Sequence, residues 1–191
     1  MVCRSIAPAL CALVLAVPPA ADGAGALCRA AAREAAARHD VPPRIMQAIA
    51  LVETRHTVGG ETGPWPWTLN IAGDGRWFDT RAAAARAARR ALAGGERLID
   101  LGCFQLNYRW HGEAFDDISA MLDPARSGDY AARFLAALHA ESGDWLTAAG
   151  HYHSRTPRHA RRYRRLVAAA LGEDLRVAAA HPDLDPAPPA R

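Results

Sequence analysis

Glu53 is the residue whose type and position most directly suggest catalysis, because it lies at the end of an apolar segment at residues 42–54. Pro43 suits the first position of a helix, where its missing N–H costs no hydrogen bond. Ile45 and Ile49 recur at helical spacing, so the last turn places the Glu53 carboxyl beside an apolar stripe. Desolvation and the negative end of the helix dipole both raise the pKa of such a carboxyl. A proton held near neutrality makes Glu53 a candidate general acid; the alternative is the solvated edge of a core helix.

The other reactive or ligating side chains do not form a familiar catalytic or metal-binding arrangement. The sequence has no G-x-S-x-G elbow, no phosphate-binding P-loop and no H-E-x-x-H pair. His151 and His153 are two positions apart, a spacing that directs them to different sides of a helix. We therefore expect no metal site and no cofactor. Asp100, Asp116 and Asp117 are the only nearby candidates for a second carboxylate, and nothing in the sequence favours any of them.

The N-terminal segment has the composition of a secretory signal peptide. An apolar stretch at residues 6–17 follows a positive residue and is too short to span a bilayer comfortably. The small residues 24–26, Ala-Gly-Ala, fit the A-x-A cleavage rule. We expect residues 1–26 to be removed on export, with a cut after Ala20 or a buried core helix as alternatives. No second apolar run is long enough to cross a membrane, so a soluble periplasmic protein without a stable membrane anchor is expected.

Export changes the meaning of the four cysteines. Cys3 and Cys11 leave with the signal peptide, and Cys28 and Cys103 remain as a single pair in an oxidising compartment. A disulfide between them would close a loop of about 75 residues and stabilise the fold by about 4–5 kcal/mol. Two free buried thiols are the alternative. The bulky Leu27 directly before Cys28 argues against attachment of a lipid there.

Composition bounds the size of the domain and the choice of partners. Half of the 191 residues are hydrophobic, which suits one domain with a substantial core. The formal net charge of +3 is compatible with an anionic polymer but does not require one. Anionic wall polymers account for the basic run at residues 161–165 as well as a nucleic acid would, and export argues against a nucleic-acid partner, so none is expected.

The elements that position these residues are mostly helices. Helical periodicity, capping residues and Pro or Gly boundaries predict helices at residues 28–39, 43–54, 80–94, 115–121, 124–142, 145–152 and 157–171. Gly172 is expected to end the last helix, and residues 173–191 are expected to form a disordered Ala- and Pro-rich tail.

A small β-insertion is expected between the second and third helices and just after the third. Aromatic and β-branched residues at 65–71 and 76–78 flank a Gly-Asp-Gly turn, which is typical of a β-hairpin. The apolar segment 98–106 is predicted to add a third strand, and residues 57–66 are predicted to be a loop. The fold class is therefore mainly α, an α+β arrangement in one domain at residues 27–172.

Three short motifs carry a resemblance to a known family. They are Glu-Thr at residues 53–54, Gly-Cys-Phe-Gln at 102–105 and Ala-Ala-Gly-His-Tyr at 148–152. Their order and spacing are similar to the Glu-Ser, Gly-Leu-Met-Gln and Ala-Tyr-Asn-Ala-Gly motifs of the soluble lytic transglycosylase catalytic domain, a member of the lysozyme-like superfamily. The resemblance covers residues 28–171. The sequence departs from the family at Thr54, where Ser is usual, and at Cys103-Phe104, where Leu-Met is usual. It also departs at residues 153–155, His-Ser-Arg, where Asn-Ala-Gly is usual, and in a longer segment at 59–98.

The resemblance implies cleavage of the β-1,4 bond between N-acetylmuramic acid and N-acetylglucosamine in peptidoglycan. Glu53 would protonate the glycosidic oxygen and then, as a base, activate the muramic 6-hydroxyl, which gives a 1,6-anhydromuramoyl end. No second carboxylate would be needed, in contrast to most glycosidases. A raised pKa suits both steps.

The same resemblance implies roles for three further residues. Gln105 would bind sugar amides and hydroxyls, Phe104 would form an apolar wall for a sugar ring, and Tyr152 would orient Glu53 or the substrate N-acetyl group. The alternatives are a loop-capping amide for Gln105 and plain core positions for Phe104 and Tyr152. Some of the tryptophans are expected to stack on sugars: Trp65, Trp67, Trp77 and Trp110.

Two other functions remain open at this point. A lysozyme-type hydrolase would cleave the same bond with water. A non-catalytic periplasmic protein would bind glycan, or serve as a scaffold, for a secretion or flagellar assembly machine. In each case the expected protein is a monomer whose partner is the peptidoglycan glycan strand.

Overall fold

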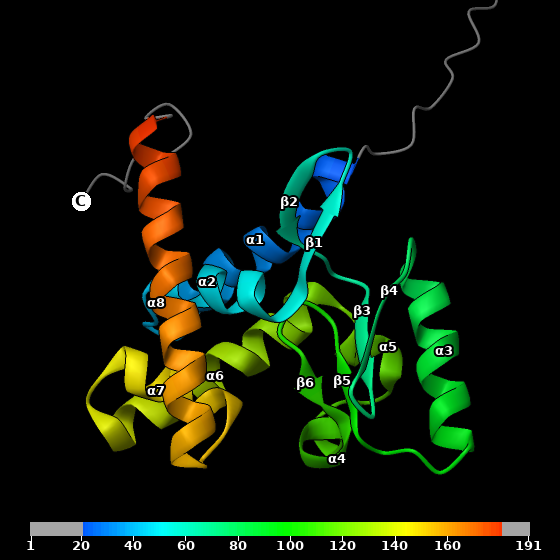
Figure 1. Cartoon of the computed structure of the whole chain (residues 1–191). Helices are drawn as coiled ribbons and strands as arrows, with labels where there is room; N and C mark the ends of the chain where they lie inside the picture. Colours follow the sequence, from blue (N-terminus) through cyan, green and yellow to red (C-terminus); the bar gives the residue numbers. More distant parts are fainter. Residues whose placement is uncertain (1–20, 181–191) are drawn as a thin grey trace, which may run out of the picture.

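The computed structural model describes residues 21–180 of the chain. Most of these residues are helical, and small antiparallel sheets lie beside the long helices (Figure 1). A mainly helical α+β fold is therefore confirmed. The helices are α1 (Ala21–Arg38), α2 (Pro43–Thr54), α3 (Arg81–Ala93), α4 (Tyr108–His111), the 3₁₀ turn η1 (Gly112–Ala114), α5 (Ile118–Met121), α6 (Pro124–Ser142), α7 (Trp145–His153) and α8 (Pro157–Ala180).

Local capping signals fix most of the helix boundaries. The side chains of Thr80, Asp123 and Asp144 accept backbone N–H bonds from the first turns of α3, α6 and α7. Such bonds satisfy donors that have no partner within the helix. Gly143 ends α6 in the left-handed region at φ 69°, a conformation that glycine adopts without strain. These starts and stops confirm the corresponding predictions.

Within residues 21–180, six short strands form two antiparallel sheets. One sheet has the strand order β4-β3-β5-β6, built from β3 (Thr68–Ile71), β4 (Asp74–Trp77), β5 (Ile99–Leu101) and β6 (Leu106–Asn107). The β3–β4 hairpin and the third strand β5 are confirmed. The prediction of three strands is wrong, because this sheet has a fourth strand, β6, which pairs with β5 across the turn at residues 102–105.

The prediction of a loop at residues 57–66 is also wrong. This segment lies largely within a two-stranded hairpin of β1 (Arg55–Val58) and β2 (Glu61–Pro64). Gly59 and Gly60 have φ of 60° and 87°, which are the values that a tight hairpin turn of matching twist requires. The hydroxyls of Thr57 and Thr62 are 2.8 Å apart across the pair.

Two helix ends differ from the prediction. α1 begins at Ala21, upstream of the predicted start at residue 28, and α8 continues past Gly172 to Ala180. Gly172 is not in the left-handed conformation that ends a helix, and a glycine inside a helix costs only about 1 kcal/mol. Residues 173–180 of the predicted disordered tail at 173–191 are thus helical, and 181–191 lie outside the described residues. Of the signal peptide predicted at 1–26, residues 21–26 belong to α1, and 1–20 lie outside the described residues. Between residues 21 and 180, no helix is long and apolar enough to cross a membrane.

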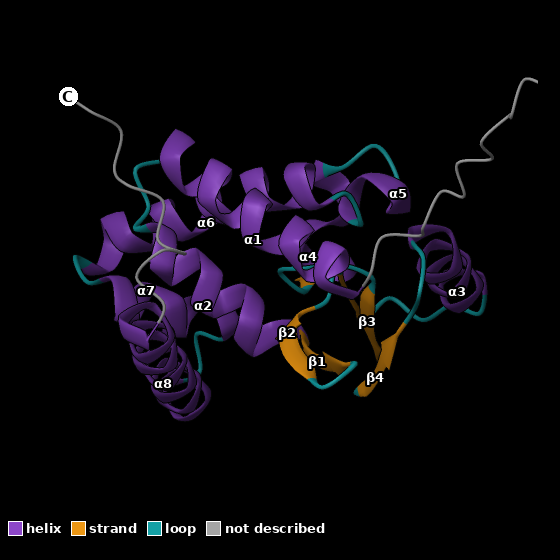
Figure 2. Cartoon of the chain, turned by 90° about the horizontal axis from the view of Figure 1, so that it is seen from above, coloured by secondary structure: helices purple, strands orange, loops and turns teal. Residues whose placement is uncertain are grey.

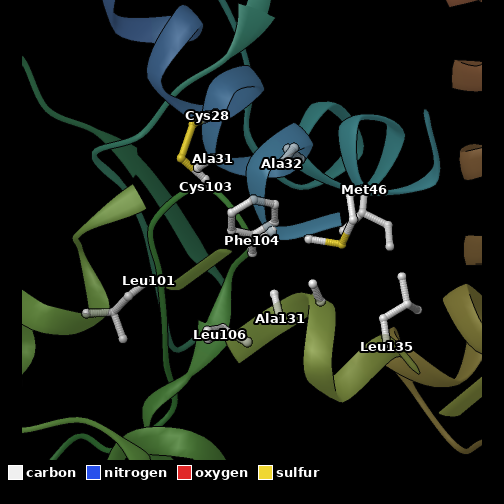
Figure 3. Packing of buried hydrophobic residues seen from close by; sticks show 14 of the residues in the cluster. Cys28, Ala31, Ala32, Met46, Leu101, Cys103, Phe104, Leu106, Ala131 and Leu135 are labelled. Carbon is white, nitrogen blue, oxygen red and sulfur yellow. A yellow bond between two sulfur atoms is a disulfide. The ribbon is translucent and has the colours of Figure 1, made fainter. Parts of the chain in front are cut away.

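Small residues let the long helices pack closely around one aromatic ring. Phe104 is fully buried and lies among Ala31 and Ala32 of α1, Met46 of α2 and residues of α6 (Figure 3). A methyl group at Gly128 of α6 would meet the Phe104 ring at 3.1 Å, so this position must be small. The strands and α3 lie to one side of the long helices (Figure 2). This arrangement brings the end of α2 to the boundary between helices and strands.

Candidate active site

Glu53 lies in the last turn of α2, where helical packing turns it toward α8. The face of α2 formed by Ile45, Met46 and Ile49 is buried in the core. The Glu53 side chain is itself partly buried. Its Oε1 accepts a hydrogen bond of 2.6 Å from the hydroxyl of Tyr163 on α8, a residue 110 positions away in sequence.

The environment of Glu53 raises its pKa from 4.5 to about 7. Burial is the main cause, because it disfavours the charged form, and the negative charge of Asp100 acts in the same direction. The hydrogen bond from Tyr163 opposes both effects by stabilising the carboxylate. The prediction of a raised pKa is confirmed, and Glu53 holds a proton over much of the range near neutrality.

Asp100 is one of the three candidates for a second carboxylate near Glu53, and the sequence does not distinguish it from Asp116 and Asp117. It lies on β5, and burial raises its pKa against the effect of a 2.8 Å hydrogen bond from Asn107 Nδ2. The two other candidates have structural roles: Asp116 pairs with Arg126, and Asp117 caps α5. Asp100 alone is close enough to Glu53 to contribute to its pKa.

Tyr163 is the site residue that sequence reasoning misses. Its spacing from Val167 places it in the buried stripe of α8, and it is indeed only 3% exposed. A buried tyrosine hydroxyl nevertheless requires a polar partner. That requirement was the available signal, but it does not identify which of many distant groups supplies the partner. The ring of His153 stacks on the ring of Tyr163, with 4.6 Å between the ring centroids and an angle of 3° between the ring planes.

Tyr152 supports the neighbouring turn and does not bond to Glu53. Its hydroxyl donates a 2.8 Å hydrogen bond to the backbone oxygen of Phe104. Burial raises the pKa of Tyr152 well above its usual value, and Glu53 contributes to that shift. Tyr152 is therefore near Glu53, but the tyrosine that bonds to Glu53 is Tyr163. Contact of Tyr152 with a substrate N-acetyl group stays a prediction.

Phe104 and Gln105 differ from their predicted roles. Phe104 is completely buried, so the prediction that it forms a wall against a sugar ring is wrong. The amide of Gln105 donates to the backbone oxygens of Gly102 (3.0 Å) and Thr68 (3.2 Å), which is the loop-capping alternative. Its backbone has φ of 44°, in a region that costs a non-glycine residue about 1 kcal/mol or more. The side chain of Gln105 is partly buried at the boundary between turn and sheet.

A disulfide links Cys28 of α1 to Cys103, which confirms the predicted pairing (Figure 3). Both residues are buried, and their Cα atoms are 5.5 Å apart. The bond fixes the turn that carries Phe104 and Gln105 to α1.

A group of aromatic rings begins directly after Glu53. The His56 ring stacks on Trp77 at 5.3 Å and meets the edge of Trp65 at 5.2 Å, and Trp67 meets Trp65 in turn. The backbone N–H of Trp65 donates to the backbone and hydroxyl oxygens of Thr54, both at 3.1 Å. Trp77 is 46% exposed, so this cluster presents an aromatic surface to solvent beside the end of α2.

The described part of the chain contains no group of three or more His, Cys, Asp and Glu side chains placed to hold a metal ion. No protein-family model, curated protein or solved structure matches the chain. The chemistry of the site therefore has to be argued from its own residues: a protonated carboxyl, a tyrosine that holds it and a second carboxylate nearby.

Removing the Tyr163 hydroxyl should raise the pKa of Glu53 further. In Tyr163→Phe the carboxylate loses the hydrogen bond that stabilises its charged form, while the ring can still stack on His153. Hydrogen bonds to charged groups contribute about 1.5–3 kcal/mol, which corresponds to roughly one pH unit or more. We expect an NMR titration of the Glu53 carboxyl to move upward from about 7 by that amount.

The matched control is Tyr152→Phe, because the hydroxyl that it removes donates to the backbone oxygen of Phe104 and not to Glu53. It should move the titration of Glu53 less than Tyr163→Phe does. An unchanged Glu53 titration in Tyr163→Phe would show that the hydrogen bond does not set the pKa.

Proposed function

We propose that the protein is a peptidoglycan lytic transglycosylase that acts in the periplasm, with Glu53 as its general acid and base. The observation that carries this proposal is the state of Glu53: a carboxyl with pKa about 7, held at 2.6 Å by a buried tyrosine. General acid–base catalysis is most effective when the pKa is close to the working pH. The resemblance of the three sequence motifs supplies the substrate class.

In the proposed reaction, Glu53 first donates its proton to the glycosidic oxygen as the bond to the muramic acid C1 breaks. The hydrogen bond from Tyr163 stabilises the carboxylate that forms. The Glu53 carboxylate then removes the proton of the muramic 6-hydroxyl, whose oxygen bonds to C1 and closes the 1,6-anhydro ring. Glu53 returns to its protonated state, so acid and base are one residue.

The aromatic cluster supports a glycan as the ligand. Sugar rings present apolar C–H faces, and ligand sites commonly pair such faces with aromatic side chains. His56 lies on β1, Trp65 directly follows β2 and Trp77 lies on β4, so a sugar stacked there would bind beside the end of α2 that carries Glu53. The disulfide is consistent with an oxidising compartment such as the periplasm.

Asp100 supports a second candidate, a lysozyme-type hydrolase. Most glycosidases use two carboxylates, one as acid and one as nucleophile or base. The charge of Asp100 acts on Glu53, although burial also raises the pKa of Asp100 itself. In the hydrolase Asp100→Asn should abolish cleavage, whereas in the transglycosylase it should leave cleavage in place with a slightly lower pKa of Glu53.

Product analysis separates these functions. Purified sacculi are digested with the exported form of the protein in water enriched in ¹⁸O, and the soluble fragments are analysed by mass spectrometry. A transglycosylase gives anhydro ends, one water lighter than reducing ends and free of label. Labelled reducing ends would establish hydrolysis instead. Binding to sacculi without any soluble fragments would refute both and leave the non-catalytic glycan-binding role.

A further inference from the structure

A hollow away from Glu53 lies between α7 and α8, two helices that pack against each other (Figure 1). It has a volume of about 160 Å³. Its polar lining comes from Thr147, His151, Arg155, Arg161 and Arg164, and no carboxylate lines it. Gly150 forms part of its wall, where a methyl group would meet the backbone oxygen of Ala160 at 3.0 Å.

The charge around the hollow is strongly positive. The first part of α8, residues 157–171, contains five arginines and no acidic residue, and all five arginines are exposed. Two of them, Arg161 and Arg164, line the hollow, whereas Tyr163 between them is buried toward Glu53. The hollow therefore lies on a different side of α8 from the proposed active site.

Two carboxylates near the hollow bond to residues of its lining but leave Arg161 and Arg164 without an ion pair. Glu141 pairs with Arg155 at 2.7 Å. Asp144 caps α7 by accepting bonds of 2.7 Å from the backbone N–H and the hydroxyl of Thr147. These bonds to Thr147 are the main reason that the pKa of Asp144 is lowered, with a smaller contribution from Arg164. No ion pair neutralises Arg161 or Arg164 within the described part of the chain.

His151 adds an imidazole ring to the same lining. Its Nδ1 is buried and has no hydrogen-bond partner within residues 21–180. A proton on Nδ1 would therefore be an unsatisfied buried donor, which costs about 1–3 kcal/mol. This unpartnered nitrogen belongs to a residue of the hollow's lining.

We propose that this hollow binds a phosphate group. Arg161 and Arg164, which no ion pair neutralises within residues 21–180, line this hollow together with the His151 ring and with Arg155, whose partner is Glu141. A phosphate has several acceptor oxygens and more than one negative charge near neutrality, whereas a carboxylate offers only two oxygens to such a set of donors. Guanidinium groups bind phosphate in a two-pronged geometry, which favours arginine over lysine at such sites. The proposed cleavage reaction does not use these residues.

The test measures binding of inorganic phosphate by the full exported protein, using calorimetry at constant ionic strength maintained with chloride. We expect saturable binding that falls at least tenfold in the double variant Arg161→Ala/Arg164→Ala. Arg86→Ala/Arg90→Ala on α3 is the matched control, since it removes the same charge from another exposed helix face. The absence of saturable binding by the unmodified protein, or an equal loss in both double variants, would overturn the proposal.

Vesicles identify the source of the phosphate. Co-sedimentation with phosphatidylglycerol vesicles that depends on Arg161 and Arg164, and is absent with phosphatidylcholine, would support a lipid headgroup. Binding of free phosphate without vesicle binding would support a soluble phosphate compound. Thermal unfolding of each variant checks that the fold persists, because all four arginines are exposed. None of these readouts depends on cleavage of peptidoglycan.

Discussion

Glu53→Gln should lower the rate of peptidoglycan cleavage by about a thousandfold or more, because the amide can neither donate the proton nor act as the base. The fold should persist, since the amide oxygen can still accept the hydrogen bond from Tyr163. Release of soluble muropeptides, followed over time at neutral pH, measures the effect. Release at the unmodified rate would refute the assignment of Glu53.

The same substitution should make the protein more stable at neutral pH. The pKa of Glu53 is higher in the folded state, about 7, than its ordinary value of 4.5. The folded state therefore loses stability as the pH rises from about 4.5, and the loss is complete above about 7. The shift corresponds to roughly 3 kcal/mol. At pH 8, Glu53→Gln should unfold at a higher denaturant concentration than the unmodified protein. At pH 4 the two proteins should unfold at nearly the same denaturant concentration.

A gain in stability together with a loss of activity would separate a catalytic carboxyl from a structural one. If Glu53 merely supported the helix, its replacement would lower the stability of the protein or leave it unchanged. Equal stability of the two proteins at pH 8 would show that Glu53 is not held in an unfavourable environment.

Removal of the disulfide should have the largest effect on stability. Cys28 and Cys103 are 75 positions apart, and the chain-entropy model gives a contribution of about 4 kcal/mol for such a loop. We expect the double variant Cys28→Ser/Cys103→Ser to melt about 10 °C lower than the oxidised protein. Calorimetry on the exported form measures the difference.

The control for this experiment is the unmodified protein in reductant, which should melt near the double variant if the bond itself is responsible. The serine variant should show almost no further response to reductant. Equal melting temperatures for the oxidised protein and the double variant would refute a stabilising role.

Features that depend on local sequence could be predicted, and those that depend on distant partners could not. The starts of α3, α6 and α7 follow from capping side chains within three residues of the bonds they make. The β1–β2 hairpin has few apolar residues, and its glycines also fit a loop, so its pairing is not evident from the sequence. Gly172 carries a stop signal that the neighbouring helix formers override.

The same distinction holds for the candidate site. The raised pKa of Glu53 follows from its place beside an apolar stripe, which is a local property. Tyr163 and Asp100 reach Glu53 only because α8 and β5 are brought to the end of α2. Phe104 resembles a substrate-binding residue by motif position, but the closure of α1 over α6 buries it.

The turn at residues 102–105 joins the helical and the sheet parts of the molecule by three connections, one disulfide and two hydrogen bonds. Cys103 is covalently linked to α1, the Phe104 carbonyl is held by Tyr152 of α7, and the Gln105 amide bonds to the backbone just at the start of β3. A hinge between the two parts would have to break at least one of these connections. The surroundings of Glu53 are therefore preorganised, and under the proposed function a glycan strand that binds there would have to adapt its own ring conformation and torsion angles to them.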